Sequence, residues 1–203
     1  MPVPLTHTQQ ILALAQQRHL LRARDVVNEG LPSSHLTRLV ASGLLERVAR
    51  GLYRLPDRPA HALQSLAEVA LRVPHGVVCL LSALRVHELG TQAPSAVWLA
   101  LPPHRPRPHL EHLDVRVVRM SDATRRAGVM HVDVHGIAVP VFDVAKTVAD
   151  CFKYRHRIGL DVALEAFREA WFHRRLCMDD LCRYATLNRV HQVMRPYVEG
   201  MVA

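Results

Sequence analysis

The sequence predicts an α+β protein in which an N-terminal winged helix-turn-helix is followed by a mixed α/β domain that ends in a helical bundle. Two observations carry this prediction. Three short helical patterns and one strand–turn–strand pattern come before the first proline-containing break in the chain. Strand and helix patterns then alternate over residues 60–141, whereas only helical patterns occur over residues 143–201.

A break in periodicity separates two domains. The segment LPDRPAHA, residues 55–62, contains two prolines and follows neither a helical nor a strand pattern. A length of 203 residues is sufficient for two modest cores, so we predict domains over residues 1–58 and 59–203. Residues 1–58 hold eight arginines and four acidic residues, a net charge of +4, and the longer domain carries the other +4. Positive charge is therefore denser in the first domain.

Three helices are predicted in the first domain. Thr8 can cap a first helix that is apolar along one face. A short second helix spans Arg22 to Asn28. The third spans Ser34 to Ser42, with Ser33 or Ser34 as its cap, and ends at Gly43, which suits a left-handed C-terminal conformation.

The third predicted helix has the pattern of a recognition helix. Leu36, Leu39 and Val40 recur at helical spacing and can be buried against the preceding helix. An arginine on the other side can form two hydrogen bonds to a guanine, and the helix N-terminus offers backbone donors to phosphate. The residues expected to contact DNA from this helix are Ser33, Ser34, His35, Thr37 and Arg38.

A β-hairpin is predicted after this helix. Leu44 to Val48 forms its first strand, Ala49-Arg50-Gly51 its tight turn, and Leu52 to Leu55 the returning strand. An arginine-bearing wing commonly contacts phosphates or enters a minor groove. The alternative is a hairpin that only covers the helices, with its arginines in solvent. The arginines expected to hold the DNA backbone are Arg47, Arg50 and Arg54.

The second domain combines strands and helices. Strands are predicted over residues 77–80, 97–101, 115–120, 130–134 and 137–141, and helices over residues 60–73, 82–90, 143–154, 160–172, 178–187 and 190–201. Ser82 and Asp143 are expected to cap two of these helices. The aromatic residues expected in the core are Trp98, Phe152, Phe167, Trp171 and Phe172.

The composition favours a basic, cytoplasmic, nucleic-acid-binding protein. The net charge is +8, and all but two of the 26 basic residues are arginines, whose guanidinium groups bind two phosphate oxygens at once. A GC-rich genome would produce the same arginine bias. The four cysteines form no C-x-x-C pair, and the chain has neither a signal-peptide pattern nor an apolar run of ~20 residues that could cross a membrane.

The histidines do not predict a metal site. Although the chain has 14 of them, no C-x-x-C or H-E-x-x-H motif occurs. His104, His109 and His112 fall in one predicted loop, while His131 and His135 flank the end of a strand. We expect surface or capping roles for these histidines, and neither a metal nor a cofactor.

Catalytic motifs are equally scarce. Asp133, Asp143 and Lys146 could hold magnesium in a nuclease, but Asp143 and Lys146 fit the first turn of a helix better. Lys146 and Asp150 then form an i,i+4 pair on that helix. The sequence contains no phosphate-binding glycine loop and no Gly-x-Ser-x-Gly. We therefore expect a protein that is not an enzyme.

Three segments of the sequence carry a resemblance to a known family. They are the run from Thr8 to GLYRLP, the segment VCLLSALRVHELGTQAPSAVWLALPPHRPRP, and the segment HGIAVPVFDVAKTVADCFKYRHRIGLDVALEAFREA. In this order they resemble the AbiEi-type antitoxins, the regulators of type IV toxin–antitoxin systems. The resemblance covers nearly the whole chain, and its departures are small, such as Gly90 after His87-Glu88-Leu89.

The resemblance implies two activities. The N-terminal winged helix would repress the antitoxin–toxin operon by binding repeats in its double-stranded promoter, and the second domain would carry the antitoxic activity. The toxin of such a pair is typically nucleotidyltransferase-like, and the antitoxin usually opposes it without a stable complex. The residues expected at an antitoxin surface are Ser82, Arg85, His87, Glu88 and Lys146, although His87 and Glu88 could instead close their helix against the sheet.

Two other functions fit the same residues. One is a winged-helix transcriptional regulator whose second domain senses a small ligand. The other is a DNA-processing enzyme of the nuclease type. For the antitoxin and repressor the expected mechanism is steric, because a protein bound at the operator blocks transcription.

Overall fold

The computed structural model describes residues 6–18, 20–56, 63–110, 113–134 and 136–202, and the chain divides into two compact units. One unit consists mostly of residues 1–64 and the other mostly of residues 65–203. Each unit combines helices with strands, so the chain is an α+β protein, as the sequence predicts. The predicted domain boundary at residue 58 falls within residues 57–62, outside the described residues.

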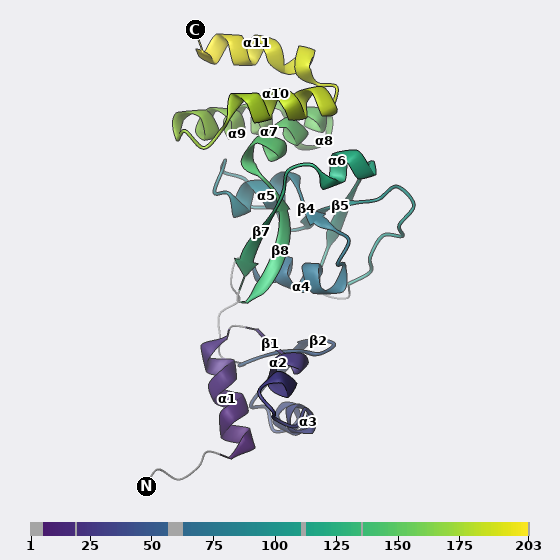
Figure 1. Ribbon diagram of the computed structural model, residues 1–203, viewed down its shortest axis with the longest axis vertical. Helices are drawn as coiled ribbons and strands as arrows, with labels where there is room; N and C mark the ends of the chain where they lie inside the picture. The colour runs from purple at the N-terminus through teal and green to yellow at the C-terminus, as the bar shows by residue number, and fades with distance from the viewer. Residues whose placement is uncertain (1–5, 19, 57–62, 111–112, 135, 203) are drawn as a thin grey trace. The chain divides into compact units, whose positions relative to one another are not determined.

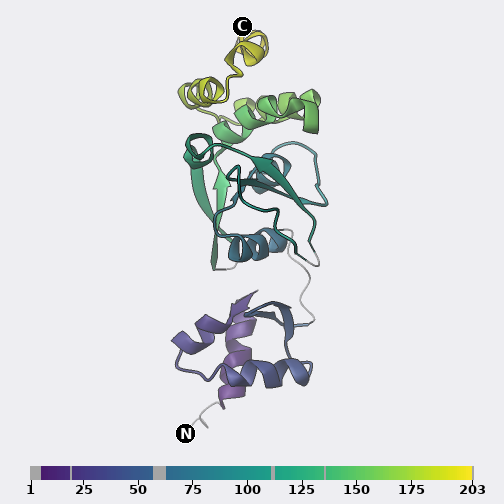
Figure 2. The ribbon, with the colours of Figure 1, turned by 90° about the vertical axis from the view of Figure 1, so that its right-hand side faces the viewer.

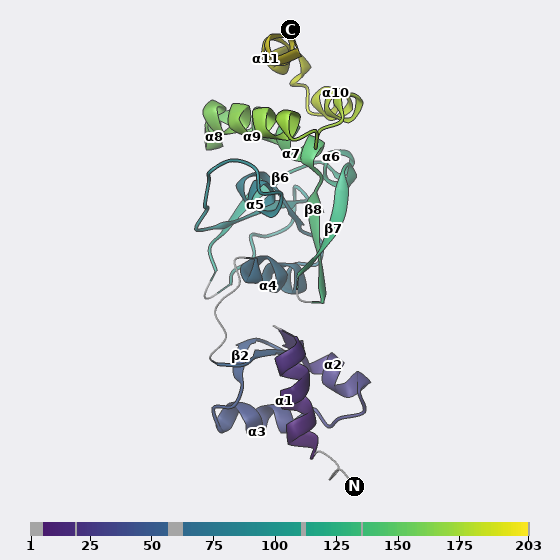
Figure 3. The same cartoon turned by 90° about the vertical axis from the view of Figure 1, so that its left-hand side faces the viewer.

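The first unit contains three helices and a small sheet. Its elements in chain order are α1 (His7–Gln17), β1 (Leu21–Arg22), α2 (Ala23–Asn28), α3 (Ser34–Ala41), β2 (Glu46–Ala49) and β3 (Leu52–Arg54). The strands are antiparallel in the order β1-β3-β2. Helices α2 and α3 lie on one side of these strands (Figure 3). Strand β1 is not predicted from the sequence because two residues are too few to produce a pattern.

One apolar cluster joins the three helices with β1 and β3. Aliphatic side chains from each helix meet Tyr53 of β3 and the residues that flank the helices. The buried members are Ile11, Ala15, Leu21, Val26, Leu31, Leu36, Leu39, Leu45 and Tyr53, and Leu12, Leu14, Ala23, Val40 and Leu55 pack against them.

Helix α1 begins earlier than the sequence predicts. Thr6, not Thr8, is its N-cap: the Thr6 hydroxyl accepts a hydrogen bond from the Gln9 amide, and the Gln9 side chain accepts one from the Thr6 amide. This reciprocal capping box satisfies two backbone donors at once. Thr8 therefore lies inside the helix and not at its cap.

The second unit has a central sheet and eight helices among its described residues. Its elements are α4 (Gln64–Arg72), β4 (Val77–Val78), α5 (Leu80–Val86), β5 (Val97–Leu101), β6 (Val115–Arg119), α6 (Asp122–Arg126), β7 (Val129–Val134), β8 (Ile137–Phe142), α7 (Val144–Lys153), α8 (Arg155–Ile158), α9 (Leu160–Phe172), α10 (Met178–Leu187) and α11 (His191–Val202). The predicted bounds of β5, α9 and α10 are confirmed. The short helices α6 and α8 are not predicted.

The strands of this unit follow the order β6-β5-β4-β8-β7. Strand β4 runs antiparallel to β5 and parallel to β8, and β5 runs parallel to β6. Helices α7 to α11 lie beyond one end of the sheet and α4 lies at the other end (Figures 1 and 2).

Helix α7 is the centre of the second core. Every residue of α7 from Ala145 to Phe152 is buried. Asp143 caps the helix, as predicted, and its carboxylate accepts hydrogen bonds from the Lys146 amide at 2.7 Å and the Tyr184 hydroxyl at 2.9 Å. Gly128 is required beside this cap, because a Cβ there would lie 2.7 Å from the Lys146 Cβ and its φ is +68°.

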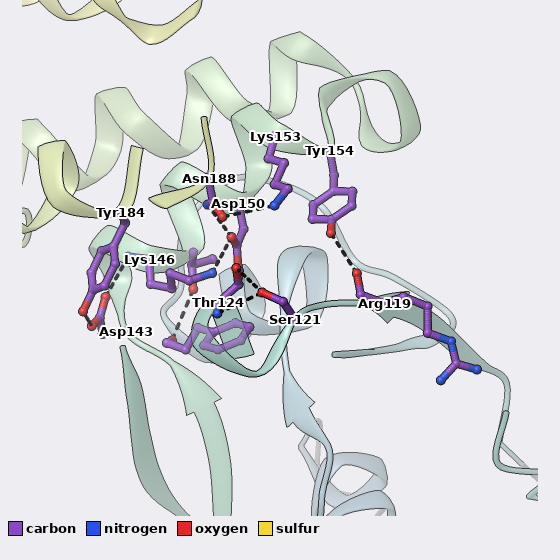
Figure 4. A network of polar contacts seen from close by, with 12 residues as sticks. Arg119, Ser121, Thr124, Asp143, Lys146, Asp150, Lys153, Tyr154, Tyr184 and Asn188 are labelled. Atoms are coloured by element: carbon purple, nitrogen blue, oxygen red, sulfur yellow. Dashed lines mark hydrogen bonds and ion pairs between the residues drawn. The ribbon is translucent and has the colours of Figure 1, made fainter. Parts of the chain in front are cut away.

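A charged network is buried between α7 and the end of α10 (Figure 4). The ammonium group of Lys146 pairs with the Asp150 carboxylate, and both side chains are fully buried. The Asn188 amide donates to the same Asp150 oxygen at 2.7 Å. Burial raises the pKa of Asp150, although the charge and hydrogen bond of Lys146 and the hydrogen bond of Asn188 oppose the shift. The predicted i,i+4 pair therefore exists, but in the core.

One predicted core aromatic lies on the surface. Phe152 and Phe167 are fully buried and Trp98 is 3% exposed, as expected, whereas Trp171 is only half-buried and Phe172 is 78% exposed. Helix α9 buries Val162, Ala166 and other residues of one face, and Phe172 falls outside that face at the last helical position.

We predict that Lys146→Met destabilises the protein by about 3–5 kcal/mol, because it leaves the Asp150 carboxylate buried without its cation. The double variant Lys146→Met/Asp150→Asn should recover most of this loss, since the neutral amide keeps an acceptor for Asn188. Denaturant unfolding, monitored by tryptophan fluorescence, measures the free energy of unfolding of both variants, because Trp98 and Trp171 belong to the second unit.

Arg195→Ala is the matched control, because it removes a cation from the exposed i,i+4 pair with Glu199. Exposed pairs contribute at most about 1 kcal/mol. A loss in Lys146→Met no larger than in this control, or a double variant less stable than the single one, would contradict the prediction.

Candidate nucleic-acid interface

Helix α3 buries one face and exposes the other. Leu36 and Leu39 are 1% and 3% exposed and belong to the apolar cluster of the first unit. The side chains of Ser34, Thr37 and Arg38 are exposed. Because the apolar side chains are inside, the helix presents hydroxyl groups and a guanidinium to solvent, as the sequence predicts.

The start of α3 is capped by backbone rather than by a serine side chain. The Leu36 amide donates to the Ser33 carbonyl at 3.0 Å, and the His35 amide donates to the Pro32 carbonyl at 3.2 Å. Ser33 stands at the N-cap position, but its hydroxyl makes no capping hydrogen bond to the helix. The expectation of a side-chain cap is wrong here, because Ser33 has the backbone angles of a helical turn, φ −64° and ψ −19°.

His35 is less accessible than the other polar residues of α3. It is half-buried, and its ring packs edge-on against His7 of α1 with centroids 5.6 Å apart. Its Nδ1 atom is buried without a hydrogen-bond partner among the described residues. The sequence predicts His35 as a groove contact, whereas the structure places its ring between α1 and α3, where it braces one helix against the other.

With respect to the residues that the structure describes, the hairpin carries two arginines without an ion pair and one paired arginine. Arg47 and Arg50 are exposed, and Arg50 occupies the turn between β2 and β3. Arg54 instead forms an ion pair with Glu46 across the hairpin, with both its Nε and Nη2 atoms 2.7 Å from one Glu46 oxygen. The carboxylate competes with any phosphate for Arg54, so Arg47 and Arg50 are the better placed of the three predicted contacts.

The hairpin turn is joined to the start of α2. The Ala23 amide donates to the Gly51 carbonyl at 2.9 Å. Arg50 directly precedes Gly51 on the chain, Arg24 directly follows Ala23, and Arg24 is exposed. Arg24 is a candidate contact that sequence reasoning missed, because the Gly51–Ala23 hydrogen bond joins residues 28 positions apart.

Asp25 fastens α2 to the residues before it. Its carboxylate accepts hydrogen bonds from the Arg22 side chain at 2.8 Å and the Arg22 amide at 3.2 Å, and lies 3.3 Å from Arg18. Burial opposes ionisation of Asp25, but the hydrogen bonds from Arg22 and the charges of Arg22 and Arg18 outweigh it, so its pKa is lowered. These two arginines are therefore structural.

The first unit thus offers an anion-binding surface. Among its described residues, four arginines have exposed side chains and no ion pair; they are Arg24, Arg38, Arg47 and Arg50. Guanidinium groups bind phosphate oxygens, and exposed hydroxyls on a helix hydrogen-bond to base edges or phosphates.

Two of the predicted antitoxin-surface residues instead fasten α5 to the sheet. Ser82 is 3% exposed and lies inside α5, not at its start. Its hydroxyl accepts from the Trp98 amide at 2.9 Å. His87 is 6% exposed and its Nε2 lies 2.7 Å from the Phe142 carbonyl; burial, reinforced by the charge of Arg175, lowers its pKa. The expectation that Ser82 caps a helix is wrong.

The other three residues of that set differ in exposure. Lys146 is fully buried in its pair with Asp150, so it cannot form part of a surface. Arg85 and Glu88 are exposed at the end of α5. A surface in this region is therefore built from Arg85 and Glu88, with Ser82 and His87 holding α5 to the sheet beneath them.

Within residues 6–18, 20–56, 63–110, 113–134 and 136–202, no group of three metal-ligating side chains is present. His112 and His135, which complete the two histidine groups in the sequence, lie outside the described residues. No helix among those residues is both long and apolar enough to span a bilayer.

Comparisons with known proteins connect the first unit to a family. Residues 9–56 match the family model described as "Transcriptional regulator, AbiEi antitoxin". The crystal structure of the RV2827C protein from Mycobacterium tuberculosis is similar in fold, with a TM-score of 0.59 and 15% identity over 91% of this chain and 72% of that one. No curated protein sequence matches the chain.

We predict that Asp25→Asn lowers the free energy of local opening of α2 at neutral pH by about 1–3 kcal/mol, because it removes the negative charge that binds Arg22 and Arg18. Since folding lowers the pKa of Asp25 below its ordinary value of 3.8, its stabilisation is present above that value and is lost as the pH falls through the lower folded pKa. Hydrogen exchange of the full chain, read on peptides that cover residues 21–28, measures both effects.

The wild-type protein should lose protection in this segment as the pH falls from about 5 to 3, and Asp25→Asn should show a smaller change over the same range. Asp179→Asn is the control, because Asp179 is an exposed acid on α10. Equal protection of residues 21–28 in all three proteins at pH 7 would refute the assigned role.

Proposed function

We propose that this protein regulates transcription by binding double-stranded DNA through its first unit, because residues 9–56 match the family model of AbiEi antitoxin transcriptional regulators. In this proposal the unit is a winged helix-turn-helix. Helices α1 to α3 form the trihelical part, α3 is the recognition helix, and the hairpin β2–β3 is the wing. The order of helices and strands, with β1 paired to β3, supports this assignment.

The observation that carries the proposal is the two-sided character of α3. Its buried side chains, Leu36 and Leu39, fix the rotation of the helix about its own axis. Thr37 and Arg38 are thereby held outward on a rigid element. A recognition helix requires this combination, because base edges are read by side chains that project from a well-braced scaffold.

The proposed contacts divide into base readout and backbone binding. Arg38 forms two hydrogen bonds to a guanine in the major groove, and Ser34 and Thr37 reach neighbouring base edges or phosphates. Arg47 and Arg50 of the wing, with Arg24 from α2, bind the phosphate backbone and so set the position of the protein on the duplex. Backbone contacts contribute affinity, whereas the α3 contacts contribute sequence preference.

The remaining predicted residues have supporting roles in this proposal. Ser33 adds a hydroxyl at the N-terminus of α3, where backbone amides favour a phosphate. His35 holds α3 against α1 through His7. Arg54 reaches a phosphate only when it exchanges its bond to Glu46, so it contributes less than Arg50.

We further propose that the protein acts as an antitoxin and represses its own operon in a type IV toxin–antitoxin system. Repression is steric, and the protein catalyses no reaction in it. The partner toxin is nucleotidyltransferase-like, and protection from it proceeds without a stable complex. The second unit carries the antitoxic activity, with Arg85 and Glu88 at the end of α5 as its exposed motif residues.

We predict that Arg50→Ala weakens binding to duplexes of every sequence, because a phosphate contact carries no sequence information. The slope of log affinity against log salt concentration should flatten by about one unit. Titrations of the full chain against DNA from upstream of its own gene, at several salt concentrations, measure the change. In cells the same variant should derepress a reporter behind that promoter and still protect against the co-expressed toxin.

Arg126→Ala is the matched control for Arg50→Ala, since the Arg126 side chain is 75% exposed on α6 of the second unit. This variant should retain the wild-type slope and repression. An unchanged slope in Arg50→Ala would remove the wing from the interface, and simultaneous loss of repression and toxin protection would show that the two activities do not separate.

Arg38→Ala should instead weaken binding to the operator by roughly 1–3 kcal/mol, because the contact with one base pair is lost. Its affinity for unrelated duplexes should stay nearly unchanged. A set of duplexes with each operator position substituted in turn locates that position: the variant should no longer discriminate there, while the other positions keep their effect. If Arg38→Ala lowers affinity uniformly across the set, α3 contacts the backbone and does not read the groove.

A further inference from the structure

The end of α9 carries a hollow with an unusual lining. Trp171, Phe172, Arg174 and Leu176 surround a volume of about 460 Å³. Phe172 is 78% exposed, the largest exposure among the large hydrophobic residues that the structure describes. Together with Trp171 and Leu176 it forms an apolar patch, and such patches mark binding surfaces. We refer to these four residues as the aromatic–arginine hollow.

The local sequence produces the hollow directly. Helix α9 buries Val162, Ala166 and Ala170 along one face, and Phe172 ends the helix away from that face. Arg174 then adopts a left-handed conformation, with φ +52°, and turns the chain back. The Arg175 amide closes this turn by donating to the Ala170 carbonyl at 2.9 Å.

Two long-range hydrogen bonds hold the hollow in place. The Arg175 side chain donates to the His87 carbonyl at 2.6 Å, and the Gly90 amide donates to the Glu169 carboxylate at 2.6 Å. Both bonds connect the end of α9 to the end of α5, and Figure 1 shows these two ends on the same side of the second unit. The hollow is therefore a fixed feature of the fold.

The surroundings of the hollow are cationic. The segment WFHRR, residues 171–175, places a histidine and two arginines directly after its two aromatic residues. His173 and Arg174 are exposed and form no ion pair within the described part of the chain. The nearest carboxylate along the chain, that of Glu169, is occupied by the Gly90 amide. The described residues that line the hollow include no carboxylate.

This lining matches the chemistry of an unpaired nucleotide. A nucleobase can stack on an exposed aromatic face, and a guanidinium beside it can bind the phosphate, which is how proteins hold single strands without reading their sequence. A volume of about 460 Å³ lies within the range of small-ligand pockets. A duplex does not fit this chemistry, because its bases are stacked on one another and present only their edges.

We propose that the aromatic–arginine hollow binds single-stranded nucleic acid, with one unpaired base stacked on Phe172 and the adjoining phosphate on Arg174. The site lies on the second unit and does not depend on the duplex-binding surface of α3 and the wing. It gives the second unit a nucleic-acid ligand of its own.

The test is fluorescence anisotropy of a labelled 12-nucleotide oligouridylate titrated with the full chain. Stacking of one base contributes roughly 1–3 kcal/mol, so Phe172→Ala should weaken binding about tenfold, and Phe172→Trp should restore it because the indole also stacks. Arg174→Ala should weaken binding and flatten its salt dependence. Met130→Ala, at another exposed apolar residue, and Arg126→Ala should bind as the wild type does.

A second probe separates base stacking from charge. An oligomer with the same number of phosphates but no bases should bind the wild-type chain about tenfold more weakly than oligouridylate, and Phe172→Ala should bind the two probes equally. Equal affinity of the wild type for both probes, equal affinity of Phe172→Ala and the wild type for oligouridylate, or no binding at micromolar protein would overturn the proposal.

Duplex binding in the same variants distinguishes this site from the proposed repressor surface. Phe172→Ala should keep the wild-type affinity for upstream duplex DNA, and Arg50→Ala should keep the wild-type affinity for oligouridylate. If Arg50→Ala abolishes oligouridylate binding while Phe172→Ala preserves it, the single strand binds at the first unit and the hollow is excluded. This result is independent of whether the duplex proposal itself holds.

Discussion

Burial of the apolar side of α3 is the constraint on which the proposed function depends. Leu36 and Leu39 lie in the same cluster as Ile11 of α1, and this packing determines which side of α3 faces outward. Were the helix rotated by about 100°, Thr37 would take the place of Leu36 and point toward the core, and the present outward surface would be lost. A hydrophobic free energy of roughly a few kcal/mol, gained by burying Leu36 and Leu39, thus orients the polar groups that would contact DNA.

The sequence was most informative where local periodicity determines structure. The bounds of β5, α9 and α10 are confirmed, because each is an uninterrupted strand or helix pattern with a clear end. The Asp143 cap and the buried side of α3 follow from the same local rules. The family resemblance reached further: it named the regulator family whose model residues 9–56 match.

Long-range contacts account for what the sequence could not predict. The Lys146–Asp150 spacing indicates an i,i+4 pair on any helix, but only the packing of α7 against the end of α10 makes that pair a buried one. Arg24 becomes a candidate contact only through a hydrogen bond between Gly51 and Ala23. Phe172 is apolar like a core residue but lies on the surface, because it stands at the last position of α9, outside the buried face of the helix.

The most direct test of the central claim, that α3 lies against DNA bases, is site-specific photocrosslinking of the full chain. A photoreactive amino acid replaces Thr37 on α3 or, as the control, Thr186, an exposed threonine on α10. With duplex DNA from upstream of the gene, the account predicts a crosslink from position 37 to bases at a defined site and none from position 186. Equal crosslinking from the two positions, or no crosslink to DNA from position 37, would contradict it.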